Sequence, residues 1–129
     1  MQLQVSVLSK PGGRKVNEDA YGFWSSPQAN SFFCVVSDGA GGHGGGDVAS
    51  KLVVEAVIEC FRAKPECSGD AIDVALHTAN ATVVKNQANE ARVSDMRATA
   101  VVVAIDTVRG RAAWGHIGDS RLYLFRGGK

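Results

Sequence analysis

The sequence has no apolar run long enough to cross a membrane and no excess of either charge. Its 129 residues include 14 Lys and Arg and 13 Asp and Glu, which gives a formal net charge of +1. A membrane helix needs about 20 consecutive apolar residues. Charges of both signs are mixed along the chain, so no basic patch points to nucleic acid or to an anionic membrane surface. We therefore expect no nucleic-acid partner and no membrane partner.

Targeting and disulfide signals are also missing. The first residues, Met1 to Val5, lack the basic stretch and apolar block of a signal peptide. Only three cysteines occur, at irregular spacing, and an odd count argues against a disulfide framework and for a reducing compartment. No repeat or linker divides the chain, and its length suits one domain, residues 1–129. The sequence predicts a single cytoplasmic domain.

Apolar periodicity predicts two central helices between two groups of strands. A period of two predicts strands, and rows at i, i+4 spacing predict helices. The predicted strands are residues 2–7, 20–24, 32–37, 98–105, 111–117 and 121–126. The nearly continuous apolar run 98–105 is typical of a strand that is covered on both faces. Strands grouped apart from helices favour an antiparallel α+β fold over an alternating βαβ one.

The two predicted helices have identifiable ends and buried stripes. The first helix begins with Asp47 as its N-cap and ends before Pro65, and the second runs from Ser68 or Asp70 to about Ala91. The expected buried rows are Ala49, Val53, Val57 and Phe61, with Val48, Leu52, Ala56 and Cys60 beside them, and then Ile72, Ala75, Leu76, Ala79 and Val83.

A glycine-rich stretch joins the strand at 32–37 to the first helix. Asp38 follows the strand directly, and residues 39–46 contain six glycines. Glycine allows close approach of a ligand to the backbone. A carboxylate at the end of a buried strand suits a hard metal ion, whereas a glycine-rich turn before a helix also suits a phosphate group. The stretch alone leaves both interpretations open.

Acidic residues stand at three strand ends: Glu18 and Asp19, Asp38, and Asp119. If these strand ends converge, a cluster of carboxylates without histidine or thiolate partners prefers Mg²⁺ or Mn²⁺. Arg14 lies four residues before Glu18, and its planar guanidinium matches phosphate geometry. For any one of these acids taken singly, capping or turn hydrogen bonds are the better explanation of the residue.

Three segments together resemble a known family. Residues 14–20 (RKVNEDA), 38–43 (DGAGGH) and 115–121 (GHIGDSR) are similar to three ordered motifs of the metal-dependent protein phosphatases, the type 2C serine/threonine phosphatases. The residues of these motifs are most similar to those of the bacterial branch, and the resemblance covers essentially the whole chain. It implies a four-layer α-β-β-α sandwich of antiparallel sheets, of which this chain supplies the N-terminal part.

The resemblance also implies roles for the acidic residues. Asp38 would bridge two Mg²⁺ or Mn²⁺ ions, and the Gly39 carbonyl would contact one of them. Glu18 and Asp19 would hold metal-bound waters or the adjoining shell, and Asp119 would serve a third, accessory metal ion.

The implied reaction is hydrolysis of a phosphoserine or phosphothreonine ester. The catalytic residues would be Asp38 and Arg14, with Arg14 binding the substrate phosphate. Metal-activated water would attack directly, so Ser37 would be a strand-end packing or hydrogen-bonding residue and not a nucleophile. The expected partner is a phosphorylated protein, with a serine/threonine kinase acting in opposition.

Two departures from the family pattern matter. Many eukaryotic members place a histidine, a proposed general acid, directly after the Asp-Gly pair, where this chain has Ala40. His43 fits the bacterial pattern, the acid role is not carried over to it, and a structural role in the glycine loop suits it. The family's catalytic domain is also about twice as long, and its later half supplies two further aspartates. We therefore expect the 129-residue chain alone to be inactive or very weakly active.

Two other functions remain open. The chain could be a pseudophosphatase or a regulatory fragment that uses the fold to bind a partner. Residues 39–44 also match the Gly-x-Gly-x-x-Gly dinucleotide fingerprint after a strand and before a helix. Against dinucleotide binding, Asp38 would place a negative charge beside the pyrophosphate, and the following helix leads to a second helix instead of a parallel strand.

Overall fold

A computed structural model describes residues 1–42 and 45–129. In chain order the elements are β1 (Asp19–Ser26), β2 (Ser31–Ala40), α1 (Gly45–Ala63), α2 (Gly69–Asn89), the 3₁₀ helix η1 (Ala91–Val93), β3 (Arg97–Ala98), β4 (Ala100–Asp106) and β5 (Arg111–Ile117).

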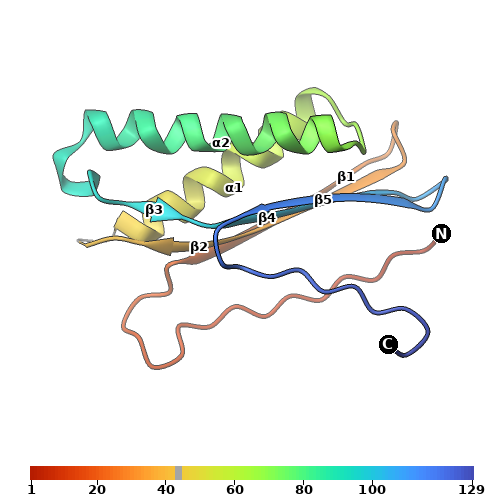
Figure 1. Ribbon diagram of the computed structural model, residues 1–129, viewed down its shortest axis with the longest axis horizontal. Helices are drawn as coiled ribbons and strands as arrows, with labels where there is room; N and C mark the ends of the chain where they lie inside the picture. Colours follow the sequence, from red (N-terminus) through yellow and green to blue (C-terminus); the bar gives the residue numbers. More distant parts are fainter. Residues whose placement is uncertain (43–44) are drawn as a thin grey trace.

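The strands form one antiparallel sheet of order β1-β2-β4-β5, and β3 pairs with the end of β2. Both helices cover the same face of this sheet (Figure 1). The α+β class and the antiparallel sheet predicted from the sequence are thereby confirmed. This chain supplies one helix layer and one sheet layer of the expected sandwich. No helix in the described part of the chain combines the length and the apolar character that spanning a bilayer requires.

The core lies between the helices and the sheet. Phe33 of β2 is fully buried and stacks on Phe61 of α1, with ring centroids 4.2 Å apart, and on Trp24 of β1 at 5.9 Å. Burying one such side chain contributes about 1.5–3 kcal/mol. The row Ala49, Val53, Val57 and Phe61 on α1 and the stripe on α2 are buried as predicted. These contacts hold α1 across β1 and β2.

The helix ends agree only in part with the sequence prediction. Ser68 caps α2 as expected, because its hydroxyl oxygen accepts a hydrogen bond from the Ala71 N–H at 3.1 Å. The prediction that Asp47 is the N-cap of α1 is wrong, since α1 begins at Gly45. Asp47 instead lies in the first turn and forms an ion pair with Lys51 at 3.2 Å. Its charge still favours the positive end of the helix dipole.

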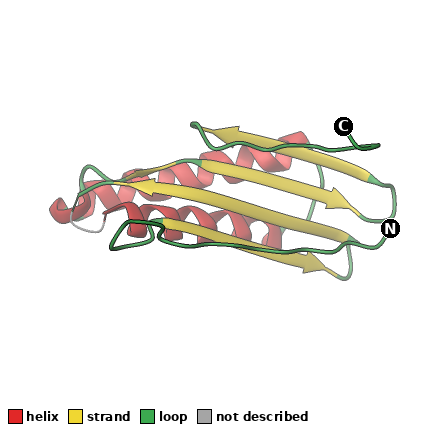
Figure 2. Cartoon of the chain, turned by 90° about the horizontal axis from the view of Figure 1, so that it is seen from below, coloured by secondary structure: helices red, strands yellow, loops and turns green. Residues whose placement is uncertain are grey.

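The predicted strands at 2–7 and 121–126 are wrong. The first segment alternates and the second is an apolar run between two arginines, yet neither is a strand. They run over the face of the sheet that the helices leave open (Figures 1 and 2). A strand needs a hydrogen-bonding neighbour as well as an alternating pattern, and β1 and β5 end the described sheet. The predicted strand at 98–105 is also divided, into β3 and β4, by Thr99.

Candidate functional site

The antiparallel register brings two of the three acidic strand ends together. Asp38 of β2 lies directly opposite Asp19 of β1. On its other side, the Asp38 carbonyl accepts a hydrogen bond from the Thr99 N–H at 2.8 Å, and the Asp38 N–H donates to the Thr99 hydroxyl at 3.1 Å. Asp38 is therefore held on both sides at one end of the sheet.

The electrostatic surroundings of Asp38 are negative. Desolvation raises the pKa of the Asp38 carboxyl group above its usual value, and a hydrogen bond with the Asp19 side chain, the charge of Asp19 and the charge of Asp119 raise it further. The Arg14 guanidinium acts in the opposite direction. Carboxylates that repel one another in this way favour a proton or a cation between them.

A polar pocket of about 170 Å³ adjoins this acid pair. Arg14 and Lys10 contribute positive charge to its lining, and Glu18, Asp19 and Asp38 contribute negative charge. The turn that presents Arg14 is closed by a hydrogen bond from the Arg14 N–H to the Pro11 carbonyl at 3.2 Å. The pocket thus places the Arg14 guanidinium and the strand-end acids around one small space. Lys10 was not predicted from the sequence.

Two glycines of the glycine-rich stretch, Gly39 and Gly46, allow β2 to pack closely against α1. A Cβ atom on Gly39 would lie 1.9 Å from the Gly46 carbonyl oxygen, and one on Gly46 would lie 1.9 Å from the Glu18 carboxylate. The Gly39 N–H donates to the Glu18 carbonyl at 3.1 Å. Only glycine allows the strand end, the helix start and Glu18 to meet at these distances.

Asp119 reaches the site through the turn after β5. The Ser120 hydroxyl lies 2.5 Å from the Thr99 hydroxyl, and Gly118 has a φ of +94° and packs against Thr99. Asp119 is therefore near enough for its charge to raise the pKa of Asp38. Thr99 and Ser120 were missed in the sequence analysis. Thr99 could have been noticed in the sequence, because its hydroxyl group interrupts the apolar run 98–105.

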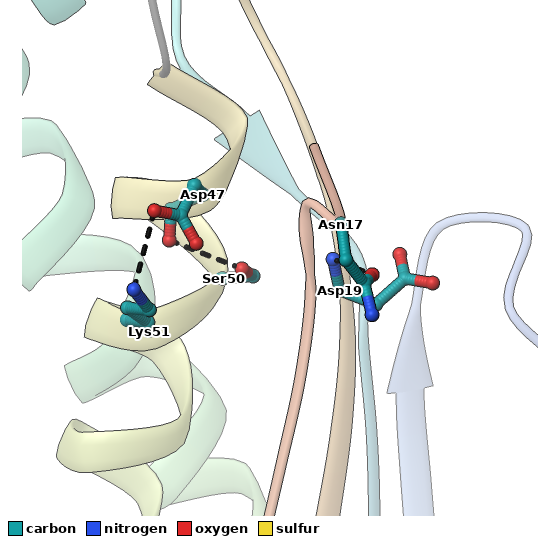
Figure 3. A network of polar contacts seen from close by, with 5 residues as sticks. All are labelled: Asn17, Asp19, Asp47, Ser50 and Lys51. Atoms are coloured by element: carbon teal, nitrogen blue, oxygen red, sulfur yellow. Dashed lines mark hydrogen bonds and ion pairs between the residues drawn. The ribbon is translucent and has the colours of Figure 1, made fainter. Parts of the chain in front are cut away.

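Ser37 and Asp47 lie outside the acid cluster. Ser37 is fully buried, and its hydroxyl donates to the Thr99 carbonyl at 2.6 Å, which is the strand-end hydrogen bonding expected of it. Figure 3 shows Asp47 and Lys51 on α1, well away from the Asp19 carboxylate, which points away from that helix. His43 lies outside the described residues.

The oxygen ligands of the candidate site meet the needs of a hard divalent cation only in part. Asp19 and Asp38 offer carboxylate oxygens, which are the ligands that Mg²⁺ and Mn²⁺ favour. A cation between the two carboxylates would also offset their mutual repulsion. Within residues 1–42 and 45–129, however, no group of three or more His, Cys, Asp or Glu side chains is placed to hold a metal ion. The described residues therefore offer this pair of carboxylates and fewer protein ligands than a complete site for such a cation has.

The described part of the glycine-rich stretch, residues 39–42, does not fit dinucleotide binding, and the last glycine of the fingerprint, Gly44, lies outside the described residues. The dinucleotide fingerprint belongs to a parallel βαβ unit, whereas every strand pair described in this sheet is antiparallel. The space beside Gly39 is filled by the backbone of Gly46.

Known proteins similar to this chain are bacterial phosphatases. The chain is 34% identical over 119 residues to the serine/threonine protein phosphatase PstP of Mycobacterium tuberculosis, covering 90% of this chain and 21% of PstP. It is 28% identical over 131 residues to the protein phosphatase PhpP of Streptococcus pneumoniae, covering 97% of this chain and 51% of PhpP. The chain thus spans about half of PhpP and about a fifth of PstP.

Solved structures show the same arrangement. The crystal structure of M. tuberculosis PstP/Ppp superposes with a TM-score of 0.74 and 29% identity, over 90% of this chain and 46% of that chain. A Stage II Sporulation E family protein from Thermanaerovibrio acidaminovorans gives a TM-score of 0.67 at 29% identity, over 85% of this chain and 50% of that one. The sequence profile of the family described as Protein phosphatase 2C matches residues 12–129. The chain belongs to the protein phosphatase 2C family.

Proposed function

We propose that residues 1–129 are the N-terminal part of the catalytic domain of a metal-dependent protein-serine/threonine phosphatase. The observation that carries this proposal is the placement of Asp38 between Asp19 and Thr99, beside a polar pocket lined by Arg14. The similarity to PstP and PhpP, which are named as phosphatases, supports it.

In the proposed site, the strand-end acids hold two Mg²⁺ or Mn²⁺ ions. When bound, such ions activate water and neutralise the charge of a phosphate ester. Asp38 would be the shared ligand, because it lies between Asp19 and Thr99 and because the charges of Asp19 and Asp119 both act on its carboxyl group. Gly39 offers its carbonyl oxygen, and Glu18 and Asp19 orient bound waters. Asp119 belongs to an accessory third site next to this centre.

Arg14 holds the phosphate of the substrate in this proposal. Its guanidinium carries a fixed charge and can form two parallel hydrogen bonds to phosphate oxygens. Arg14 and Asp38 line the same small pocket, so a phosphate bound by Arg14 lies next to the acid pair. Lys10 adds a second positive charge to the same lining.

The proposed substrate is a protein phosphorylated on serine or threonine, and a serine/threonine kinase supplies that phosphoprotein. We place the reaction in the cytoplasm, as part of a signalling system. The support for this substrate class is the similarity to PstP, a serine/threonine protein phosphatase. The three free cysteines favour a reducing compartment.

The test is a chimera that joins residues 1–129 to the part of the M. tuberculosis PstP catalytic chain that has no match here. With 10 mM MnCl₂ and a phosphothreonine peptide, we expect hydrolysis that EDTA abolishes. Asp38→Asn should lower kcat at least about 100-fold, the scale seen when one transition-state-stabilising group is removed. Asp47→Asn is the matched control, since Asp47 is an acid on α1 outside the cluster, and it should retain activity.

The isolated 129-residue chain should show less than about 1% of the activity of the chimera, because one acid pair is a weak site for two ions. Equal rates for the chain and the chimera would contradict the proposed division of the site. Near-normal activity of the Asp38→Asn chimera would overturn the role of Asp38.

A second candidate function is a non-enzymatic module, a pseudophosphatase or regulatory fragment. It is favoured by one observation: the described residues contain no group of three potential metal-ligating side chains. A chimera that folds cooperatively and binds Mn²⁺ at Asp38, yet hydrolyses neither phosphoserine nor phosphothreonine peptides, would support this function over the enzyme.

A further inference from the structure

The segment that precedes β1 brings positive charge to the candidate site. Residues 9–17 contain three lysine and arginine residues and no acidic residue, in a chain of net charge +1. Two of these cations, Lys10 and Arg14, line the polar pocket beside Asp38. Residues 1–18, all of which the structure describes, form no helix or strand. Regular secondary structure therefore does not hold these cations at the pocket, and other contacts must do so.

The Asn17 side chain joins the two ends of this segment. Its Nδ2 donates a hydrogen bond to the Ser9 hydroxyl at 2.8 Å, which closes a loop from Ser9 to Asn17. Its Oδ1 accepts a hydrogen bond from the Asp19 N–H at 3.1 Å, where β1 begins (Figure 3). One amide side chain thus ties the loop both to itself and to the strand that carries Asp19.

The loop holds Arg14 close to the acids without pairing it with them. Arg14 follows a tight turn that is closed by its N–H bond to the Pro11 carbonyl, and Gly12 in this turn has a φ of +64°, which favours glycine. Arg14 and Asp38 line the same pocket. The ion pairs among residues 1–42 and 45–129 nevertheless do not include Arg14. Its guanidinium N–H groups are therefore available to a phosphate.

We propose that Asn17 is a positioning residue, which holds the Arg14 turn at the phosphate pocket through its hydrogen bond to Ser9. The inference rests on the proposed phosphatase function, because that function assigns the phosphate of the substrate to Arg14. Closing a loop costs conformational entropy, and the bond between Asn17 and Ser9 offsets part of that cost before the substrate binds. Without this bond the turn is less restricted, so binding of the substrate has to order it.

The test is the kinetics of the chimera with M. tuberculosis PstP after Ser9→Ala, which removes the bond that closes the loop and keeps the bond between Asn17 and Asp19. We expect KM for a phosphothreonine peptide to rise about three- to tenfold, the effect of one hydrogen bond. The kcat should stay within about twofold, as when only substrate binding is lost. Ser9→Thr retains the hydroxyl and should restore KM. Ser6→Ala is the matched control, because Ser6 is an exposed serine of the same segment, and KM should not change.

Combined substitutions test whether the effect passes through Arg14. Residues that act as a unit have non-additive effects, so in an Arg14→Ala chimera Ser9→Ala should change KM by less than about twofold. Asn17→Ala should raise KM at least as much as Ser9→Ala does. The proposal is overturned by a KM within twofold of wild type for Ser9→Ala, or by the full effect of Ser9→Ala in the Arg14→Ala background. A lower kcat with unchanged KM for Asn17→Ala would also overturn it, because Asn17 would then act on Asp19 alone.

Phosphate binding by the metal-free 129-residue chain tests the same link without turnover. Inorganic phosphate, added to about 100 mM at constant ionic strength, should shift the NMR signal of the Arg14 Nε–H group. Ser9→Ala should raise the apparent dissociation constant about three- to tenfold. Equal dissociation constants, or no shift in the wild-type chain, would overturn the proposal. A chimera that hydrolyses no phosphopeptide would instead contradict the phosphatase function, and the phosphate titration would then decide the role of Asn17.

Discussion

Asp19 and Asp38 lie directly opposite each other in the antiparallel pairing of β1 and β2, and the Asp19 side chain raises the pKa of the Asp38 carboxyl group. Because the two strands are joined by a short turn at residues 27–30, this pairing is built into a single hairpin. The acid pair at the centre of the candidate site therefore belongs to this one hairpin and needs no other segment to bring its two members together. Asp119 and Arg14 then act on that centre from the two ends of the chain.

Asp38→Asn should stabilise the metal-free chain at neutral pH. The pKa of Asp38 is raised in the folded state, so the folded state binds the proton more tightly than the unfolded state does. The ionised carboxylate therefore costs folding free energy, and this cost grows as the pH rises from below about 4 through the folded-state pKa. Urea unfolding should show a gain for Asp38→Asn at pH 7 that disappears at pH 3.

Glu55→Gln controls for the change in net charge, since Glu55 is exposed on α1. An equal gain from both substitutions at pH 7, or a loss of stability from Asp38→Asn, would contradict the repulsive role of the Asp19–Asp38 pair.

Mn²⁺ should stabilise the wild-type chain, and EDTA should reverse the effect. A cation between Asp19 and Asp38 offsets their repulsion in the folded state. At a Mn²⁺ concentration ten times the dissociation constant, binding adds about 1.4 kcal/mol to the free energy of unfolding. We expect a dissociation constant in the millimolar range, because two carboxylates make a weak site. Thermal unfolding with and without 10 mM MnCl₂ measures the shift, and Asp38→Asn should show none. A shift of the same size in both proteins would mean that Mn²⁺ binds elsewhere.

The sequence was sufficient to predict the helices and the interior strands, because their apolar periodicity records which face packs on the core. The stripe of α2 from Ile72 to Val83 is buried as predicted. The segment 2–7 has equally clear alternation, yet it forms no strand. Alternation reports only that one face of a segment is apolar. A strand also depends on a neighbour that the local sequence does not specify.

The candidate site could be predicted only as a set of strand ends. That Asp38 lies opposite Asp19 depends on the register of a hairpin, and a shift of one residue would have moved one of them to the other face. Asp119 approaches through a contact between Thr99 and Ser120, which lie 21 positions apart in sequence. Neither hydroxyl belongs to the acidic pattern. The glycines indicated a special backbone, whereas its cause, the contact of Gly39 with Gly46, required the structure.

Gly39→Ala should destabilise the chain by about 3 kcal/mol or more, at the upper end of the cost of overpacking. The added Cβ atom would lie 1.9 Å from the Gly46 carbonyl oxygen, and a backbone atom at the start of α1 cannot move without displacing the helix. Gly69→Ala is the matched control, because nothing lies within 4 Å of its added Cβ atom. Gly69 begins α2, and the alanine should be neutral or stabilise by up to about 1 kcal/mol. Urea unfolding compares the two, and equal stabilities would refute the close packing of β2 on α1.

Thr99→Val should loosen the site without disturbing the core. Thr99 accepts a hydrogen bond from the Asp38 N–H and contacts the Ser120 hydroxyl. Valine has nearly the same shape and lacks the hydroxyl, so both partners lose a hydrogen bond, at a cost of about 1–2 kcal/mol.

The specific readout for Thr99→Val is hydrogen exchange at the Asp38 amide, which should accelerate at least tenfold, whereas amides in the middle of β2 should change only by the overall loss of stability. Thr99→Ser retains the hydroxyl and should restore protection. Thr107→Val removes a hydroxyl that donates to the Asn30 carbonyl at the other end of the sheet, and it should leave the Asp38 amide protected. If Asp38 exchanges equally fast in the Thr107 and Thr99 variants, the link from Asp38 through Thr99 to the turn that carries Asp119 is wrong.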